Sequence, residues 1–256
     1  MVDTSRTPLT GRRTIVVGGS TGIGRGIADA WAAAGADVAV CSRTKPTGSG
    51  SELLSWERVD LTEPGPARDR LAELGRGRLD AVCFSSIYYG ERRALFCDVA
   101  EREWREQLEI NVTGLWLTLA ATLPTLRAAA PGLFLGVSSE VVFNAGPGRS
   151  GYTASKAAAK ALLDSVAREE DDRQQVRVVQ VLPAGMVDSP GIRRRRPADF
   201  DYSDYMQPSD FARVARELAV TAGSYHHGDS LVVNGDGDWH SADDALPVSQ
   251  SRSVSS

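Results

Sequence analysis

Residues 133–163 read LFLGVSSEVVFNAGPGRSGYTASKAAAKALL, and this stretch carries the strongest fold signal of the chain. Residues 133–137 form a short apolar run bounded by glycine, which is typical of a strand covered on both faces. The alanine-rich residues that begin at Ala154 predict a helix. A buried strand followed by a helix is the unit from which α/β proteins with a parallel sheet are built.

Tyr152 and Lys156 lie at the start of this expected helix. Residues four apart share one face of a helix, so the phenol and the ammonium face the same space. An adjacent ammonium stabilises a phenolate, and we therefore expect it to lower the pKa of Tyr152 and to make this side chain a proton donor near neutral pH. Taken alone, the spacing more often marks two residues of a helix surface.

A glycine-rich turn near the amino terminus predicts a nucleotide-binding site. Residues 14–17 form a short β-branched run, and GGSTGIGRGIADAWAAAG follows at once, which gives the order strand, turn and helix. Such a turn brings backbone and a helix N-terminus close to a pyrophosphate, although a plain structural turn uses the same glycines. The candidate cofactor contacts here are Gly18, Ser20, Thr21, Gly22, Ile23 and Gly24.

The end of the second expected strand, residues 37–41, indicates which nucleotide binds. An NAD enzyme carries a carboxylate here that accepts hydrogen bonds from the ribose hydroxyls. This chain has Ser42 followed by Arg43, and a guanidinium suits a 2′-phosphate in both charge and geometry. We expect NADP(H) as the cofactor, with a solvated surface arginine as the alternative.

The rest of the chain continues the alternation of strand and helix. Further strands are expected at 55–59, 79–84, 176–182 and 230–233, and further helices at 67–74, 101–129 and 208–222. The pattern predicts an α/β fold with a single Rossmann-type, doubly wound parallel sheet of about seven strands, helices on both faces and ligands at the carboxyl ends of the strands. Residues 1–241 are expected to form one catalytic domain with a substrate loop near 183–207, and residues 242–256 a disordered tail.

The bulk composition limits the class of protein. The chain has 256 residues, 42% of them hydrophobic and 24% charged, which is typical of one soluble domain. A formal charge of −4 argues against nucleic-acid binding, and the absence of a long apolar run argues against a membrane partner and for a cytoplasmic location. The three cysteines and three histidines lack disulfide or metal-ligand spacing, so we expect buried thiols at Cys41 and Cys83 and no metal.

Ser139 stands thirteen residues before Tyr152, and glycines 18, 22 and 24 follow the pattern Gly-x-x-x-Gly-x-Gly. With Lys156, these motifs resemble the short-chain dehydrogenase/reductase family from Gly11 to Asp238. The resemblance implies that Tyr152 protonates a carbonyl oxygen as NADPH delivers hydride, and that Ser139 binds this oxygen. It also implies that Lys156 holds the nicotinamide ribose and that Asn111 anchors a water molecule.

The family's cofactor contacts fall on Ser42, Arg43, Asp60, Leu61, Ser85, Ser86, Tyr152, Lys156, Gly185, Val187 and Ser189. One segment departs from the family pattern, because residues 84–87 read Phe-Ser-Ser-Ile where the family shows Asn-Asn-Ala-Gly. The two serines keep the small size, but Ile87 adds a branched side chain near the expected rim of the site. We therefore expect either a reshaped pocket or an altered cofactor position.

The resemblance implies an NADPH-dependent ketoreductase, and we expect one that serves the biosynthesis of a specialised metabolite. Aromatic and methionine side chains on segments near the expected pocket suit a bulky, partly apolar ketone, although ordinary loop packing explains them equally well. These residues are Tyr88, Tyr89, Phe143, Met186, Tyr202, Tyr205 and Met206. The alternatives are an enzyme that oxidises an alcohol, one with a non-standard redox or isomerising step, and a non-catalytic cofactor-binding regulator.

Two features bear on partners other than the cofactor. The run Arg193–Arg196 would suit an anionic substrate or the acidic face of a carrier protein, but such a run is more often simply solvated. The family resemblance implies a homotetramer or homodimer built on the long central helices. The alanine-rich face after Ala154 would allow such helices to pack closely.

Overall fold

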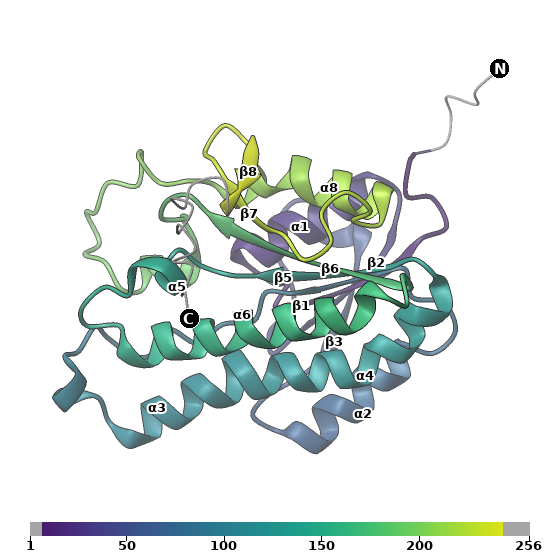
Figure 1. Ribbon diagram of the computed structural model, residues 1–256. Coiled ribbons are helices and arrows are strands. Elements are labelled where there is room, and N and C mark those ends of the chain that lie inside the picture. Colours follow the sequence, from purple (N-terminus) through teal and green to yellow (C-terminus); the bar gives the residue numbers. More distant parts are fainter. Residues whose placement is uncertain (1–6, 243–256) are drawn as a thin grey trace, which may run out of the picture.

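Eight strands form one sheet in the computed structural model, which describes residues 7–242 (Figure 1). Their order is β3-β2-β1-β4-β5-β6-β7-β8, and all neighbours are parallel except β7 and β8. The strands are β1 (Arg13–Val17), β2 (Asp37–Ser42), β3 (Leu54–Arg58), β4 (Ala81–Phe84), β5 (Gly132–Val137), β6 (Val176–Pro183), β7 (Ser230–Val233) and β8 (Trp239–Ser241). The predicted fold class is confirmed, with one strand more than expected.

The eighth strand was not predicted from the sequence because it is only three residues long. β8 pairs antiparallel with β7 across a tight turn, in which the backbone N–H of Asn234 donates to the carbonyl of Asp238 at 2.8 Å. The predicted disordered tail began at residue 242, whereas Ala242 is buried directly after β8. Residues 243–256 lie outside the described part of the chain.

Helices cover both faces of the sheet (Figure 1). The longer helices are α1 (Gly22–Ala33), α2 (Pro64–Leu74), α3 (Glu101–Leu108), α4 (Gly114–Ala129), α6 (Ser150–Asp171) and α8 (Ala212–Thr221). The short ones are η1 (Ser51–Leu53), η2 (Phe96–Asp98), η3 (Glu109–Thr113), α5 (Val141–Asn144), α7 (Pro190–Arg193) and η4 (Pro208–Phe211).

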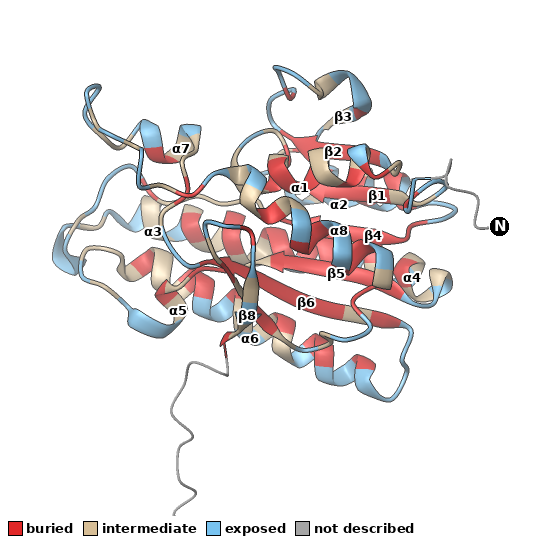
Figure 2. Cartoon of the chain, turned by 90° about the horizontal axis from the view of Figure 1, so that it is seen from above, coloured by how far each residue is buried: buried red, intermediate tan, exposed pale blue. Residues whose placement is uncertain are grey.

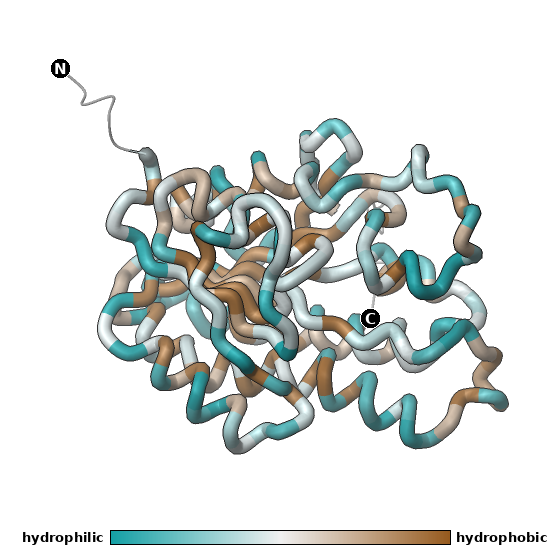
Figure 3. Tube along the Cα trace, turned by 180° about the vertical axis from the view of Figure 1, so that it is seen from behind, coloured by the Kyte–Doolittle hydropathy of each residue, from teal (hydrophilic) through white to brown (hydrophobic). Residues whose placement is uncertain are grey.

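The five central strands β2, β1, β4, β5 and β6 supply apolar side chains to both helical layers, because successive side chains of a strand point to opposite faces. In β1, Val16 packs under α1 and α8, whereas Ile15 and Val17 pack against α2, α4 and α6. Figure 2 shows these central strands buried along most of their length, whereas the edge strands β3 and β8 are partly exposed, and Figure 3 shows that the centre of the sheet is also the most hydrophobic part of the molecule. This double burial explains why the strands read as continuous apolar runs.

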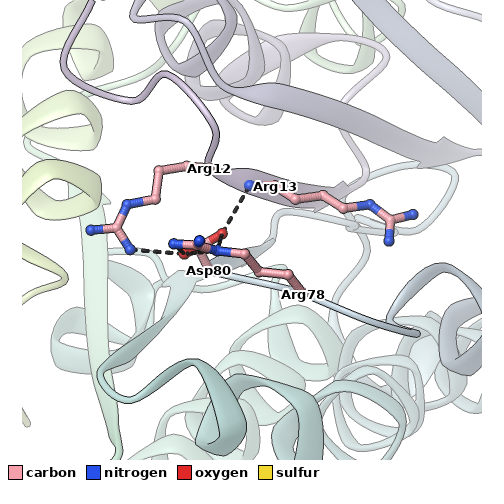
Figure 4. A network of polar contacts seen from close by, with 4 residues as sticks. All are labelled: Arg12, Arg13, Arg78 and Asp80. Carbon is pink, nitrogen blue, oxygen red and sulfur yellow. Dashed lines mark hydrogen bonds and ion pairs between the residues drawn. The ribbon is translucent and has the colours of Figure 1, made fainter.

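A buried carboxylate ties together the amino ends of β1 and β4 (Figure 4). Asp80, only 5% exposed, accepts hydrogen bonds from the Arg12 guanidinium at 2.8 Å, the Arg78 guanidinium at 2.8 Å and the Arg13 backbone N–H at 3.0 Å. β4 begins at Ala81, two residues later than the sequence predicted, because Asp80 takes part in this network.

The predicted helix at 101–129 is present, but it contains a π turn. α3 passes through η3, a single π-helical turn, into α4 without leaving the helical region, and Asn111 lies inside that turn. π turns widen a helix locally and are often found at functional sites. The predicted loop at 183–207 is largely irregular as well, apart from α7 and one bridge between Val187 and Met206.

Two observations concern the described residues as a whole. No helix within residues 7–242 combines the length and apolar character that a membrane crossing requires. Within the same range, no group of three or more metal-ligating side chains comes together. Cys41 and Cys83 are buried and unpaired, as predicted, whereas Cys97 is exposed.

Candidate active site

The glycine turn after β1 packs directly on the segment that follows β4. A Cβ atom added at Gly18 would lie 2.4 Å from the backbone nitrogen of Ser86, and one added at Gly24 would lie 2.8 Å from the Cβ of Ser85. Gly18 also has φ +85°, a conformation that side chains disfavour. Only glycine fits at these two positions. The two serines of the unusual segment 84–87 therefore still meet the glycine turn closely.

The N-terminus of α1 has the features of an anion site. Its N-cap residue Thr21 makes no side-chain capping hydrogen bond, and the first turn contains no acidic residue. The first backbone N–H groups of a helix lack partners within the helix, and the helix dipole favours an anion there. Gly22 leaves open the space beside Ser189, since an added Cβ would lie 3.4 Å from the Ser189 Cβ. Ser20 is partly exposed beside this turn, whereas Ile23 packs against the core.

Ser42 and Arg43, at the carboxyl end of β2, have different surroundings. The Ser42 hydroxyl is already engaged, because it donates to the Thr44 carbonyl at 2.8 Å and accepts from the Trp56 indole at 3.2 Å. The Arg43 guanidinium is exposed and makes no hydrogen bond or ion pair within residues 7–242. This free cation is the group suited to a 2′-phosphate, while Ser42 holds the loop.

Asp60 and Leu61 follow β3 and face different surroundings. The Asp60 carboxylate accepts from both the backbone N–H and the hydroxyl of Thr62, at 3.1 and 2.8 Å. Although partial burial opposes ionisation, these hydrogen bonds and the charges of Arg43 and Arg58 leave the pKa of Asp60 below its usual value. Leu61 is 6% exposed and fills the space beside Gly114, so its side chain belongs to the core.

Ser139, Tyr152 and Lys156 come together at the carboxyl end of β5, as the sequence predicted. The hydroxyl of Ser139 is buried and interacts with the Tyr152 phenol. The Lys156 side chain is 6% exposed, and its Nζ donates to the Val137 carbonyl at 2.7 Å. Burial lowers the pKa of Lys156 from 10.5 to about 8, because an ammonium loses hydration in the interior.

The expected fall in the pKa of Tyr152 is wrong for this structure. Burial raises the pKa of the phenol, and the neighbouring Tyr89 raises it further, while the hydrogen bond with Ser139 acts in the opposite direction. The two tyrosine rings lie 5.1 Å apart between centroids. Lys156 is not among the main causes of this shift, and its ammonium donates to the backbone of β5.

Asn111 holds the segment after β4 against the helices. Its Nδ2 donates to the Tyr88 carbonyl at 3.0 Å and to the Ser155 hydroxyl at 2.9 Å, and its Oδ1 accepts from the Tyr88 N–H at 2.8 Å. Asn111 also lines an internal cavity of about 10 Å³ beside Lys156, which has room for about one water molecule. The Asn111 amide is already bonded, whereas the Oε1 of Gln180, which lines the same cavity, is buried without a hydrogen-bond partner among the described residues, so a water there could donate to Gln180.

The segment after β6 returns to the glycine turn. Val187 is buried and pairs with Met206, whereas Ser189 is the N-cap of α7 and accepts from the Ile192 N–H at 3.4 Å. Gly185 lies on the way to this bridge, with Met206 as its nearest neighbour. Met206 is 8% exposed and belongs to the core, which agrees with ordinary packing, the alternative to pocket lining that the sequence left open.

Several side chains of the site were not predicted from the sequence. Glu140 accepts from the Ser139 hydroxyl at 2.9 Å and pairs with Arg149 at 3.3 Å. Gln107 is buried, and its Nε2 donates to the Tyr89 carbonyl at 2.9 Å, which fixes the residue that lies against Tyr152. A glutamate directly after the active-site serine is the only one of these signals that the sequence displays.

Comparison with known proteins gives the same family. Residues 12–199 match the family model described as short chain dehydrogenase. The chain is 28% identical over 245 residues to the 3-oxoacyl-[acyl-carrier-protein] reductase FabG of Chlamydia pneumoniae, covering 89% of this chain and 97% of that protein. It is also 28% identical over 249 residues to the 2-dehydro-3-deoxy-D-gluconate 5-dehydrogenase of Bacillus subtilis, covering 90% and 95%.

A solved structure agrees over nearly the whole chain. It is a putative NAD(P) dependent gluconate 5-dehydrogenase from Beutenbergia cavernae with bound NADP, 28% identical, with a TM-score of 0.78 over 91% of this chain and 98% of that one. The family match spans well over half of the chain and includes the glycine turn, Ser139, Tyr152 and Lys156. The chain belongs to the short-chain dehydrogenase family and is an oxidoreductase.

Proposed function

We propose that the protein is an NADPH-dependent ketoreductase that reduces a carbonyl group of a bulky, partly apolar small molecule. The observation that carries this proposal is the meeting of Ser139, Tyr152 and Lys156 beside a glycine turn that only small residues fit. The solved relative with bound NADP supports the choice of cofactor. When bound, this cofactor supplies the hydride.

The Tyr152 phenol is assigned the role of proton donor. Because burial raises its pKa, the phenol stays protonated at neutral pH, which suits the reduction of a carbonyl better than the oxidation of an alcohol. Ser139 would bind the carbonyl oxygen by turning its hydroxyl away from the Glu140 carboxylate, to which it donates at 2.9 Å, and would fix that oxygen next to the proton. Lys156 would hold the ribose. Burial lowers its pKa to about 8, which is close to neutral pH.

NADPH is the favoured cofactor because of Arg43. Its guanidinium makes no hydrogen bond or ion pair with the described residues. Its charge helps to lower the pKa of the Asp60 carboxyl, so the two groups lie on the same side of the site. The anion-ready N-terminus of α1 would receive the pyrophosphate. A non-catalytic cofactor-binding role is less well supported, because such a protein has no chemical need for Tyr152 and Lys156 together.

The aromatic lining supports the proposed size of the substrate. Tyr89 packs on Tyr152, and Phe200, Tyr202 and Tyr205 form an edge-to-face cluster on the segment after α7. The relatives named above act on different substrates by their names, so the link to a specialised metabolite stays a prediction. The cytoplasmic location also stays a prediction.

The first test is a titration of wild type, Arg43→Ala and the control Arg68→Ala with NADPH and NADH, followed by nicotinamide fluorescence. Arg68 is an exposed arginine on α2, away from the glycine turn. We expect wild type and Arg68→Ala to prefer NADPH, and Arg43→Ala to lose about 10- to 100-fold in NADPH affinity with little change for NADH. Equal binding of both nucleotides by wild type would contradict the assignment.

A second arm tests the proton donor. Tyr152→Phe removes the hydroxyl and keeps the ring, so we expect NADPH binding to persist while reduction of a ketone panel falls by at least about 100-fold. Turnover close to that of wild type, with NADPH bound normally, would show that another group donates the proton.

A further inference from the structure

The arginine run after α7 does not act as one surface. Arg193 forms a two-point ion pair with Asp188 at 2.6 Å and lies over the Tyr202 ring at 4.5 Å. Arg194 is exposed, and its guanidinium has no hydrogen-bonded or charged partner within residues 7–242. The remaining two arginines of the run are partly buried and directed at other segments of the site.

Arg195 and Arg196 bind neutral groups only. The Arg195 guanidinium donates to the Gly90 carbonyl and lies over the Tyr89 ring at 5.2 Å. Arg196 donates to the Tyr205 hydroxyl at 3.1 Å and lies over the Phe200 ring at 5.2 Å. Neither guanidinium has a carboxylate of residues 7–242 in hydrogen-bonding contact, so no direct ion pair offsets either positive charge within this range.

Two arginines from other parts of the chain face this pair. Arg149 precedes α6, and Arg93 lies in the loop after β4. A Cβ added at Gly148, the neighbour of Arg149, would lie 3.7 Å from the Cβ of Arg93, so these two segments are adjacent. Burial lowers the pKa of Arg93, and the charges of Arg149 and Arg196 lower it further, which agrees with Arg93 lying near both. The pKa of Arg195 is lowered as well, chiefly by burial, and Arg93 contributes to the shift. Arg93, Arg149, Arg195 and Arg196 are called the arginine cluster below.

The arginine cluster is short of negative charge. Glu140 pairs with Arg149 at 3.3 Å, and Glu103 acts on Arg195 from a greater distance. Four guanidiniums thus face two carboxylates. Arg93 makes no hydrogen bond or ion pair with any residue between 7 and 242. Like charges held together repel one another, and an added anion would relieve this repulsion.

The arginine cluster borders the proposed proton donor. Tyr89, on which Arg195 lies, is itself 5.1 Å from Tyr152 between ring centroids. Arg149 is close enough to act on the pKa of Tyr152, and its partner Glu140 accepts from the Ser139 hydroxyl. A molecule whose carbonyl reached Ser139 and Tyr152 would therefore place its next substituents beside these guanidiniums.

We propose that the arginine cluster binds an anionic group of the substrate, a carboxylate or a phosphate, that lies a few bonds from the carbonyl to be reduced. This inference rests on the proposed function and narrows the substrate class to ketones that carry an anionic group. Guanidiniums bind both groups through paired N–H donors, and Arg93 is the member with donors to spare. A solvated run would instead leave every arginine exposed in the way that Arg194 is.

The test is calorimetric binding to the full chain saturated with NADP⁺, which needs no turnover. The probes are 4-acetylbenzoate, 4-acetylphenyl phosphate and the uncharged methyl 4-acetylbenzoate, which share one aryl ketone. The variants are Arg93→Ala and the matched control Arg92→Ala, because Arg92 is the neighbour of Arg93, is exposed like Arg93, and is not among the main causes of the pKa shifts of Arg93 and Arg195. Reduction of the same three ketones by NADPH is measured in parallel.

We expect wild type and Arg92→Ala to bind at least one of the two anions about 10-fold or more tightly than the ester. Arg93→Ala should lose most of this preference while its affinity for the ester stays within about 2-fold. The better of the two anions identifies the carboxylate or the phosphate. Equal affinities for all three probes, no binding of either anion, or equal losses in the two variants would overturn the inference.

The parallel assay separates this outcome from a failure of the proposed function. Reduction of the ester without any anion preference would leave the ketoreductase assignment intact and remove the anion site. Anion binding that depends on Arg93, with no reduction of any ketone, would keep the anion site and count against ketone reduction.

Discussion

At the scale of single residues, Lys156 shows that the site is built at a cost to stability. Its ammonium is buried with one backbone carbonyl as its partner, and no carboxylate of residues 7–242 forms an ion pair with it. Burial lowers the pKa of Lys156 in the folded protein to about 8, compared with 10.5 in an unfolded chain. Below pH 8 both states are protonated, so the folded state carries the whole cost of a buried cation.

The pH dependence of stability follows from this shift. As the pH rises from 8 to 10.5, the folded protein loses its proton before the unfolded chain does, and the cost of the buried ammonium falls. We therefore expect the free energy of unfolding of wild type, relative to Lys156→Met, to rise by about 2 kcal/mol between pH 7 and pH 9.5. Urea unfolding at both pH values measures the difference.

Lys160→Met is the control for this prediction. Lys160 lies one turn further along α6, is partly exposed and pairs with Asp164 at 2.8 Å. The wild-type advantage over this variant should be nearly the same at both pH values. A difference for Lys156→Met that stays constant from pH 7 to pH 9.5 would show that the ammonium is not destabilised in the folded protein.

At the scale of elements, Asp80 joins two strands that are far apart in sequence. It binds Arg12 and the backbone of Arg13 at the start of β1, and Arg78 before β4 (Figure 4). Asp80→Asn keeps the shape but removes the charge, so we expect it to lower the free energy of unfolding at pH 7 by roughly 1–3 kcal/mol. The exposed Asp69→Asn, next to Arg68, should change it by less than about 0.5 kcal/mol.

The Asp80 contribution also has a defined pH window. Its arginine and backbone partners outweigh burial and hold the pKa of Asp80 below its usual 3.8. A depressed folded pKa means that the stabilisation is present above pH 3.8 and is lost as the pH falls through the lower, folded value. Urea unfolding at pH 7 and pH 3 should show the gap between wild type and Asp80→Asn narrowing. A gap that widens in acid would contradict this account.

Some of these elements could be predicted from the sequence and others could not. The parallel strands were predictable, because a strand buried on both faces needs a continuous apolar run such as residues 133–137. β8 was not, since its three residues depend on pairing with β7. The π turn at Asn111 leaves no mark in hydrophobic spacing, and it became visible only in the backbone.

The candidate site divides in the same way. The glycine turn and the Tyr152–Lys156 pair could be predicted, because the residues of each motif are close together in the sequence. The contact of Tyr89 with Tyr152 and the gathering of Arg93 with Arg149 join residues more than fifty positions apart. Such contacts depend on how loops pack at the sheet edge, which no spacing in a single sequence records.

At the scale of the whole molecule, the carboxyl ends of the strands bring distant segments to one edge. α5 and α7 lie at this end of the sheet in Figures 1 and 2. The glycine turn follows β1, the serine segment 84–87 follows β4, and Ser139 follows β5. This edge is where β1 and β4 run side by side while their chains continue in opposite directions across the sheet, and open α/β sheets bind their ligands at such a point.

The outer faces of α4 and α6 have no cover within the described chain. Trp116 on α4 is 51% exposed, and Ala120 on α4 and Ala157 and Ala158 on α6 are exposed too. An exposed tryptophan among small residues is typical of an interface, because aromatic side chains are enriched and alanine allows helices to approach closely. We therefore propose that the protein forms a homodimer or homotetramer through these helices.

Light scattering on size-exclusion fractions tests the assembly. Wild type should elute as a dimer or tetramer, and Trp116→Glu should shift it toward the monomer, because a carboxylate buried in a helix interface without a partner costs several kcal/mol. Leu53→Glu is the matched control, since Leu53 is 60% exposed on η1, next to the edge strand β3. It should leave the mass unchanged. A monomeric wild type, or an oligomer that Trp116→Glu leaves intact, would place any interface elsewhere on the surface.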